Sequence, residues 1–417
     1  MGKEGDVFEL GQGGGNLGFE FVYIEASPGY AAGCEGVDQG SLFHDITTGN
    51  VDQDAVGGHV GEGPGVDQMP GRGAAGNSDD DETGGHGLGQ GDLPGRQTGV
   101  GRCGAGVEHD FHPETVVAAA KARFDVTYRA ATTPLSPAEL RTALSDYDAI
   151  LPTLGDRFTA QVFADVPAPR AKILANFGVG INHIDTAAAR AAGVAVTNTP
   201  GAVTDATADI ALTLILMTAR RAGEGERLLR AHQWQGWHPT QLLGAHVTGR
   251  SLGIIGMGRI GKAVAHRCHH GFHMQVRFFN RSPVTTDLPA KQVPLPEAMA
   301  ADFVVIAVPG GPATRHMINA EALSHMAPHG ILINIARGDV VQESALIAAL
   351  QSHLIQGAGL DVYENEPLIP QTLIEMENVT LLPHLGTATL SVRTAMGRMA
   401  LANLEAHLDG NPLPNPV

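Results

Sequence analysis

The feature that most constrains the fold is a glycine motif in the middle of the chain. Gly256, Gly258 and Gly261 form a G-x-G-x-x-G pattern that follows the apolar run 252–255 and precedes a helix-like stretch and a second apolar run, 275–279. A strand–turn–helix–strand unit of about 30 residues is the context in which this pattern is specific for dinucleotides. The first glycine permits a tight turn, the second lets a pyrophosphate approach the backbone, and the third lets helix and strand pack closely. We therefore expect dinucleotide phosphates to meet the free N–H groups of the helix start, with contacts from Gly256, Gly258, Arg259, Ile260 and Gly261.

The residues after the second apolar run indicate which nicotinamide dinucleotide is bound. An acidic residue there accepts hydrogen bonds from the adenosine ribose and repels a 2′-phosphate, but this chain has Asn280-Arg281-Ser282, with Arg281 20 residues after Gly261. A guanidinium can pair with a phosphate through two parallel charge-assisted bonds, and Asn280 and Ser282 add neutral donors. The sequence predicts NADPH as the preferred cofactor and NAD as the alternative. A surface cation that stacks on adenine is the competing interpretation of Arg281.

Helical segments alternate with short apolar strands on both sides of the motif, from about residue 113 onward. This alternation predicts α/β domains with parallel sheets covered on both faces. Residues 206–230 are expected to form one long, buried connecting helix. Its most apolar part, 210–219, is too short to span a membrane, and no signal peptide is recognised. The three cysteines are far apart and are expected to be reduced, so the sequence predicts a cytoplasmic protein with no membrane partner.

Three later apolar strands each end in polar or ionisable residues: Arg337, then Asp361 with Glu366, then His384. In open α/β sheets the carboxyl ends of the strands form the ligand-binding edge. Reduction of a 2-keto acid needs a cation beside the carbonyl oxygen, which Arg337 can supply. It also needs a proton donor, for which His384 is suited, and Glu366 can orient the imidazole and favour its protonated form. The loop 177–180, with unshielded N–H groups, could bind the substrate carboxylate.

Five segments in order, "NFGVGINHID", "GMGRIG", "NIARGDVVQE", "GLDVYENEP" and "LLPHLGTAT", make the chain resemble the D-isomer-specific 2-hydroxyacid dehydrogenase family, in particular its glyoxylate/hydroxypyruvate reductase branch. The resemblance covers roughly 113–417. It implies two Rossmann-like α/β domains with parallel sheets: a flavodoxin-like substrate domain split around a central dinucleotide-binding domain that also forms a homodimer. The implied boundaries are 1–110 for an extension, 111–209 for the first part of the substrate domain, 210–390 for the NAD(P) domain, and 391–417 for the return to the substrate domain.

The resemblance also implies roles for individual residues. Arg337 binds the substrate and acts in catalysis, Glu366 orients the imidazole, and His384 is the acid/base; Val179 and Gly180 hold the substrate carboxylate. Further cofactor contacts are implied for Thr207, Pro309, Thr314, Ala336, Asp361, His384 and Gly386. Trp234 and Trp237 could reach the active site of the partner subunit, or could serve dimer packing alone.

The N-terminal quarter departs from this pattern. Residues 1–109 hold 18 acidic and 4 basic residues and 30 of the 54 glycines, so most of the net charge of −17 lies there. The remainder is nearly neutral, and we expect no nucleic-acid partner. The favoured interpretation is upstream DNA translated from a wrong start or frame. A disordered acidic extension is the alternative, and a glycine-rich phosphate loop is the least favoured. Family members begin with an apolar strand just before residue 113, whereas 103–112 contains none, which predicts a sheet lacking one strand, with an unpaired edge.

Alternative functions remain open at this point. The chain could be an NAD-linked D-2-hydroxyacid dehydrogenase of the phosphoglycerate type, or a nucleotide-sensing corepressor without catalytic activity. His266, His269, His270 and His273 have helical spacing that could suit zinc, but the reaction needs no metal and none is expected. The preferred interpretation is an NADPH-dependent reductase of small 2-keto acids.

Overall fold

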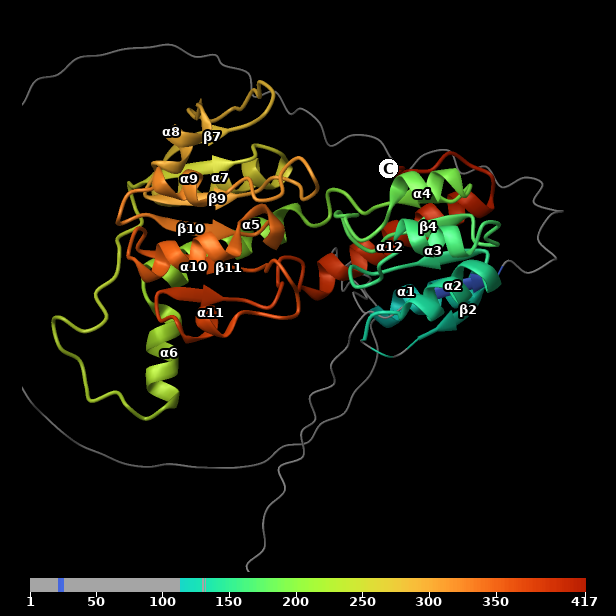
Figure 1. Ribbon diagram of the computed structural model, residues 1–417, viewed down its shortest axis with the longest axis horizontal. Coiled ribbons are helices and arrows are strands. Elements are labelled where there is room, and N and C mark those ends of the chain that lie inside the picture. The colour runs from blue at the N-terminus through green and yellow to red at the C-terminus, as the bar shows by residue number, and fades with distance from the viewer. Residues whose placement is uncertain (1–21, 26–112, 130, 132) are drawn as a thin grey trace, which may run out of the picture. The chain divides into compact units, whose positions relative to one another are not determined.

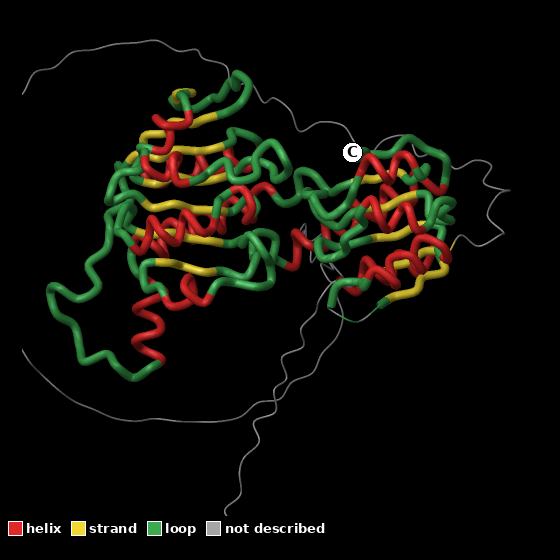
Figure 2. Tube along the Cα trace, viewed as in Figure 1, coloured by secondary structure: helices red, strands yellow, loops and turns green. Residues whose placement is uncertain are grey.

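The computed structural model describes residues 22–25, 113–129, 131 and 133–417. Apart from 22–25, the extension expected at 1–110 lies outside the described residues. The described chain forms two sheets, each with helices on both faces (Figure 2). The predicted fold class, α/β with Rossmann-type parallel sheets, is confirmed for this part of the chain.

The larger sheet contains the glycine motif. Its order is β8-β7-β6-β9-β10-β11-β12, and neighbouring strands all run parallel. The order reverses between the central strands β6 and β9, which makes their carboxyl ends the expected ligand crevice. The strands are β6 (Ser251–Ile255), β7 (Gln275–Phe279), β8 (Lys291–Gln292), β9 (Phe303–Ile306), β10 (Ile331–Asn334), β11 (Gly357–Leu360) and β12 (Val379–Leu381).

Helices cover this sheet because its strands carry apolar side chains on both faces. On one face, Leu252, Ile254 and Phe278 pack against Leu214 and Val264 of the helices α5 and α7. The opposite face has a second core that includes residues of α8, α9 and α10. The helices are α5 (Thr204–Ala219), α7 (Arg259–Phe272), α8 (Leu295–Met299), α9 (Ala320–Ser324), α10 (Glu343–Gln351) and α11 (Gln371–Glu375), with a 3-10 turn at Gly338–Val340.

The smaller sheet has the flavodoxin-like strand order β2-β1-β3-β4-β5. Its strands are β1 (Val22–Glu25), β2 (Asp125–Tyr128), β3 (Ala149–Leu151), β4 (Ile173–Ala175) and β5 (Ala195–Thr197). Its helices are α1 (Pro113–Arg123), α2 (Pro137–Asp146), α3 (Ala160–Asp165) and α4 (Thr186–Ala191). The last helix, α12 (Leu390–Leu408), returns to this sheet, where Met396, Ala400 and Leu404 share a core with Ile173 and Ala175.

The prediction that this sheet would lack a strand is wrong. Residues Val22–Glu25 lie between β2 and β3, with Val22 opposite Tyr128 on one side and Leu151 on the other. The strand is antiparallel to both neighbours, whereas β3, β4 and β5 are parallel to one another. The sequence Val-Tyr-Ile-Glu is rich in β-branched and aromatic residues, which favour strands. This strand was not expected because it lies far from residue 113 in the chain, whereas the first strand of family members directly precedes the helix that begins there.

The expectation of one long connecting helix over 206–230 is also wrong, because the segment forms two helices. α5 ends at Ala219, and a separate helix, α6 (Ala222–Arg230), begins after Arg221, whose φ of 52° lies in the left-handed region. Two glycines within α6 weaken any continuous helix. The residues of α5 face the larger sheet, whereas α6 has no buried residue. α6 and the loop that follows it stand away from the sheet (Figure 1). None of the helices in the described ranges is both long and apolar enough to cross a bilayer.

Candidate active site

The glycine motif has the geometry that a pyrophosphate needs. Gly256 has a φ of 103°, and a Cβ atom there would lie 2.8 Å from the Ala307 carbonyl. A Cβ atom on Gly261 would lie 2.1 Å from the Gly256 oxygen, so this residue must be small for α7 to approach β6. Gly258, in contrast, faces open space, and no side chain caps α7 at this residue. The first N–H groups of α7 are therefore available, and these residues fit a dinucleotide.

The segment after β7 is connected to the glycine motif by Asn280. Its side-chain oxygen accepts a hydrogen bond from the Met257 N–H at 3.1 Å, and its amide donates to the Ser282 carbonyl at 2.9 Å. Arg281 and Ser282 are exposed. The Asn280 amide group therefore supports this loop. One N–H of the Asn280 side chain remains as a donor to a ribose hydroxyl.

Glu366 and His384 are in direct contact. His384 Nδ1 lies 2.9 Å from one carboxylate oxygen of Glu366, and the other oxygen accepts the Tyr363 N–H at 2.9 Å. Burial raises the pKa of the Glu366 carboxyl, but the hydrogen bond with His384 and nearby positive charges, including Arg337, outweigh burial and hold it below its ordinary value. An ionised Glu366 selects the tautomer with a proton on Nδ1, so Nε2 of His384 is left for a substrate.

Asp361 fixes the turn that carries His384. Its carboxylate accepts the N–H groups of Leu385 at 2.6 Å and Gly386 at 2.8 Å, and its carbonyl accepts the His384 N–H at 3.0 Å. Burial raises the pKa of Asp361, against these hydrogen bonds. His384 has a φ of 55°, an uncommon backbone state that these three bonds maintain. The side chain predicted to contact the cofactor therefore also shapes the turn that carries His384.

Arg337 follows β10 and lies against the loop that follows β4. A Cβ atom on Gly180 would be 1.8 Å from Nη2 of Arg337, so only glycine leaves room for the guanidinium. Burial lowers the pKa of Arg337, while the negative charge of Glu366 favours its charged form. The Arg337 backbone is held by Asn334, whose amide donates to the Arg337 carbonyl at 2.9 Å. Arg337, Glu366 and His384 thus form one group, joined through Glu366.

The loop after β4 turns its carbonyl groups inward. The buried Asn176 amide donates to the carbonyls of Gly178 and Gly180, both at 3.0 Å, and Asn198 donates to the Val179 carbonyl at 3.0 Å. Because a trans peptide directs N–H opposite to C=O, the N–H groups of residues 179–181 point the other way. Within the described residues these three N–H groups have no protein acceptor. Successive backbone N–H groups without a protein acceptor are donors of the kind that can bind an anion.

Asn176 and Asn198 are contributors that the sequence analysis missed. Asn176 also accepts a hydrogen bond from His183 Nε2 at 3.0 Å, which gives this partly buried histidine a partner. The only available signal was the position of each asparagine directly after a short apolar run. That position does not reveal which carbonyl groups the amides will meet.

Most of the remaining predicted cofactor residues lie close to this group. Thr207, on α5, donates its hydroxyl to the Gly386 carbonyl at 3.1 Å, and the Ala336 carbonyl accepts from Arg337 Nη1 at 2.7 Å. The Thr314 hydroxyl donates to the Pro309 carbonyl at 2.7 Å. A Cβ atom on the next residue, Gly310, would lie 2.8 Å from Cγ of Arg337, so the loop after β9 reaches the same place.

Two other predicted features are not part of this group. Trp234 and Trp237 lie on the loop after α6, 51% and 80% exposed. His266, His269 and His270 are neighbours on α7, with ring centroids 4.9–5.5 Å apart, whereas His273 follows the helix in a left-handed conformation. Among the described residues, no group of three or more His, Cys, Asp or Glu side chains is arranged to hold a metal ion.

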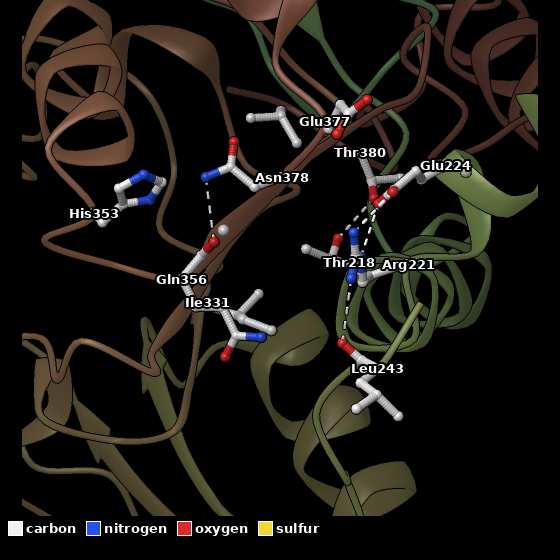
Figure 3. A pocket seen from close by; sticks show the side chains of 13 residues that line it. Thr218, Arg221, Glu224, Leu243, Ile331, His353, Gln356, Glu377, Asn378 and Thr380 are labelled. Atoms are coloured by element: carbon white, nitrogen blue, oxygen red, sulfur yellow. Dashed lines mark hydrogen bonds and ion pairs between the residues drawn. The ribbon is translucent and has the colours of Figure 1, made fainter. Parts of the chain in front are cut away.

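A cavity of about 450 Å³ lies at the other end of the larger sheet. Its lining includes the first residues of three strands, Ile331, Gly357 and Val379. Arg221 also lines it, pairing with Glu224 through two bonds of 2.8 Å (Figure 3). Arg337 and His384 follow the carboxyl ends of β10 and β12, so this cavity is separate from the candidate active site.

Comparisons with known proteins agree with this geometry. The profile of the D-isomer specific 2-hydroxyacid dehydrogenase NAD binding domain matches residues 212–386. A glyoxylate reductase from Thermococcus onnurineus is 42% identical over 313 residues, which cover 73% of this chain and 93% of that protein.

Solved structures include a 2-hydroxyacid dehydrogenase from a Polaromonas species, with 36% identity and a TM-score of 0.68, covering 73% of this chain and 96% of that one. An NADPH-dependent glyoxylate/hydroxypyruvate reductase from Sinorhizobium meliloti, in complex with NADP and malonate, matches with 36% identity and a TM-score of 0.62, covering 68% and 87%.

Proposed function

The chain belongs to the D-isomer-specific 2-hydroxyacid dehydrogenase family, and from this premise we propose that it reduces small 2-keto acids, such as glyoxylate and hydroxypyruvate, with NADPH as the preferred reductant and His384 as the proton donor. It is an NAD(P)-dependent oxidoreductase of the kind represented by its glyoxylate reductase relatives. The observation that carries the proposal is the hydrogen-bonded pair of Glu366 and His384 beside Arg337.

Substrate binding uses the loop after β4 and Arg337. The N–H groups of residues 179–181 receive the substrate carboxylate, since the carbonyl groups of the same three peptide units are bonded to Asn176 and Asn198. Arg337 adds a positive charge directly beside Gly180. A carboxylate held by charge-assisted bonds on one side fixes the direction of the adjacent keto group.

Catalysis follows from the groups around the keto oxygen. When bound, the reduced nicotinamide supplies a hydride to the carbonyl carbon, and the two electrons of the C=O π bond move to the oxygen. Arg337 stabilises the negative charge that develops there, an interaction whose loss typically costs about 10²–10³ in rate. His384 then donates a proton from Nε2 to the same oxygen, which completes the hydroxyl group. Glu366 accepts a hydrogen bond from Nδ1 and keeps the imidazole oriented before the transfer.

The cofactor preference rests on Arg281. The segment after β7 has no acidic side chain to bind the ribose hydroxyls, and the exposed guanidinium of Arg281 is free to pair with a 2′-phosphate. NADPH is therefore the preferred reductant in this proposal.

We also propose a homodimer formed through α6 and the loop that follows it. This segment exposes Leu229, Trp237 and Leu243 at 56%, 80% and 65% of their surface, which is typical of a protein interface. Sedimentation equilibrium of the purified protein tests this assignment: a mass of one chain at micromolar concentration contradicts it.

The test of function is a comparison of steady-state rates with glyoxylate, hydroxypyruvate and pyruvate, each with NADPH and with NADH. We expect the highest kcat/KM with NADPH, and we expect Arg281→Asp to shift the preference toward NADH. Turnover faster with NADH supports an NAD-linked hydroxyacid dehydrogenase instead. NADPH binding without turnover of any keto acid supports a nucleotide-sensing role.

A further inference from the structure

Gln292 makes three hydrogen bonds to the segment that carries Arg281. Its amide donates to the carbonyls of Asn280 at 3.0 Å and Ser282 at 3.1 Å, and its side-chain oxygen accepts the Val284 N–H at 3.0 Å. Gln292 is the last residue of the short edge strand β8 and is exposed. An exposed glutamine normally exchanges such bonds with water, so three bonds to one short loop indicate a specific supporting role.

These bonds hold the backbone on both sides of Arg281. Both carbonyls that flank Arg281, those of Asn280 and Ser282, accept from the same amide. The Arg281 side chain itself has no hydrogen bond or ion pair with the described residues. Its direction therefore depends on the backbone of 280–284, which Gln292 and Asn280 hold.

We propose that Gln292 is a positioning residue for cofactor specificity, which holds the 280–284 loop so that the Arg281 guanidinium meets the 2′-phosphate of NADPH. The inference rests on the proposed preference for NADPH. Two parallel bonds to a phosphate require a defined guanidinium plane. Without Gln292 the loop must be ordered during cofactor binding, which weakens binding of the phosphorylated cofactor selectively.

The substitution that tests this is Gln292→Met, which keeps the length of the side chain and removes its hydrogen bonds. The need to order one long side chain and its loop on binding weakens affinity by roughly 3- to 10-fold. We expect the dissociation constant of NADPH, measured by isothermal titration calorimetry, to rise by that factor while that of NADH is unchanged. Gln292→Glu keeps only the acceptor for the Val284 N–H. It is expected to weaken NADPH binding more than Gln292→Met does, because a carboxylate then faces two carbonyls and lies near the 2′-phosphate.

A matched control is Gln275→Met, the same chemical change at the opposite end of the neighbouring strand β7, where the exposed side chain has no bond to this loop. It is expected to leave both dissociation constants unchanged. Combining Arg281→Ala with Gln292→Met provides a double-mutant cycle. If Gln292 acts through Arg281, the double variant binds NADPH no more weakly than Arg281→Ala alone.

Each outcome decides the proposal. A selective loss of NADPH affinity that disappears in the Arg281→Ala background supports it. An equal loss for NADPH and NADH, or an unchanged ratio in a protein that prefers NADPH, overturns the role of Gln292 and leaves the proposed function intact. A wild-type protein that binds NADH as tightly as NADPH overturns both.

Discussion

Replacement of Gly180 by alanine tests the contact between the substrate loop and the catalytic arginine. The added Cβ atom would lie 1.8 Å from Nη2, 2.8 Å from Cζ and 3.1 Å from Nε of Arg337. Non-bonded carbon and nitrogen atoms need roughly 3.5 Å, so the guanidinium must move by more than about 1.5 Å. A displacement of about 1 Å at a reacting centre can cost roughly 10²-fold in rate. We therefore expect Gly180→Ala to lower kcat/KM for glyoxylate by about that factor.

The assay is the oxidation of NADPH at varied glyoxylate, together with calorimetric melting of the variant. The clashing atoms belong to the end of a flexible side chain, so we expect the fold to persist and the melting temperature to change little. Gly271→Ala is the matched control, because a Cβ atom there meets nothing within 4 Å and Gly271 lies near the end of α7. A folded Gly180→Ala protein with wild-type kcat/KM would refute the reasoning, since Arg337 could then act from a different position.

Three further predictions concern neighbouring parts of the site. Asn198→Ala releases the Val179 carbonyl and should raise KM for glyoxylate without changing NADPH affinity; equal changes in both measurements contradict the carboxylate role of this loop. Gly258→Ala should weaken NADPH binding, measured by calorimetry, at an unchanged melting temperature, whereas Gly261→Ala, whose Cβ atom would lie 2.1 Å from a carbonyl oxygen, should lower both. Burial, reinforced by the charge of Arg337, lowers the pKa of His183 from 6.5 to about 4. The unfolded chain binds this proton at higher pH than the folded one, so the free energy of unfolding should fall as pH falls from 6.5 toward 4, by up to about 3 kcal/mol. His183→Gln should flatten this dependence in denaturant titrations; an unchanged slope argues against a buried neutral histidine.

Local patterns were sufficient to predict the elements of the larger sheet. The apolar runs expected at 252–255 and 275–279, on either side of the glycine motif, became β6 (Ser251–Ile255) and β7 (Gln275–Phe279). Each of these elements is specified by neighbouring residues: a buried run, a glycine turn, or a helix start. The Glu366–His384 contact was also expected, because both residues follow adjacent strands of one parallel sheet.

Features that depend on distant partners were not predictable in the same way. β1 is a four-residue strand whose partners lie about a hundred residues later in the chain, so nothing local indicates its pairing or its antiparallel direction. The break at Arg221 depends on a left-handed residue that no glycine marks. Asn176, Asn198 and Gln292 act through amide bonds to backbone groups, which exist only once the loops have folded.

The most direct test of the account is a crystal structure of the protein with NADP and oxamate, an unreactive analogue of a 2-keto acid. We expect the carbonyl oxygen of oxamate to lie within hydrogen-bonding distance of both the Arg337 guanidinium and Nε2 of His384, with its carboxylate on the N–H groups of residues 179–181. Oxamate bound elsewhere, for example in the cavity beside Arg221, or oriented with its carbonyl away from His384, would contradict the proposed mechanism.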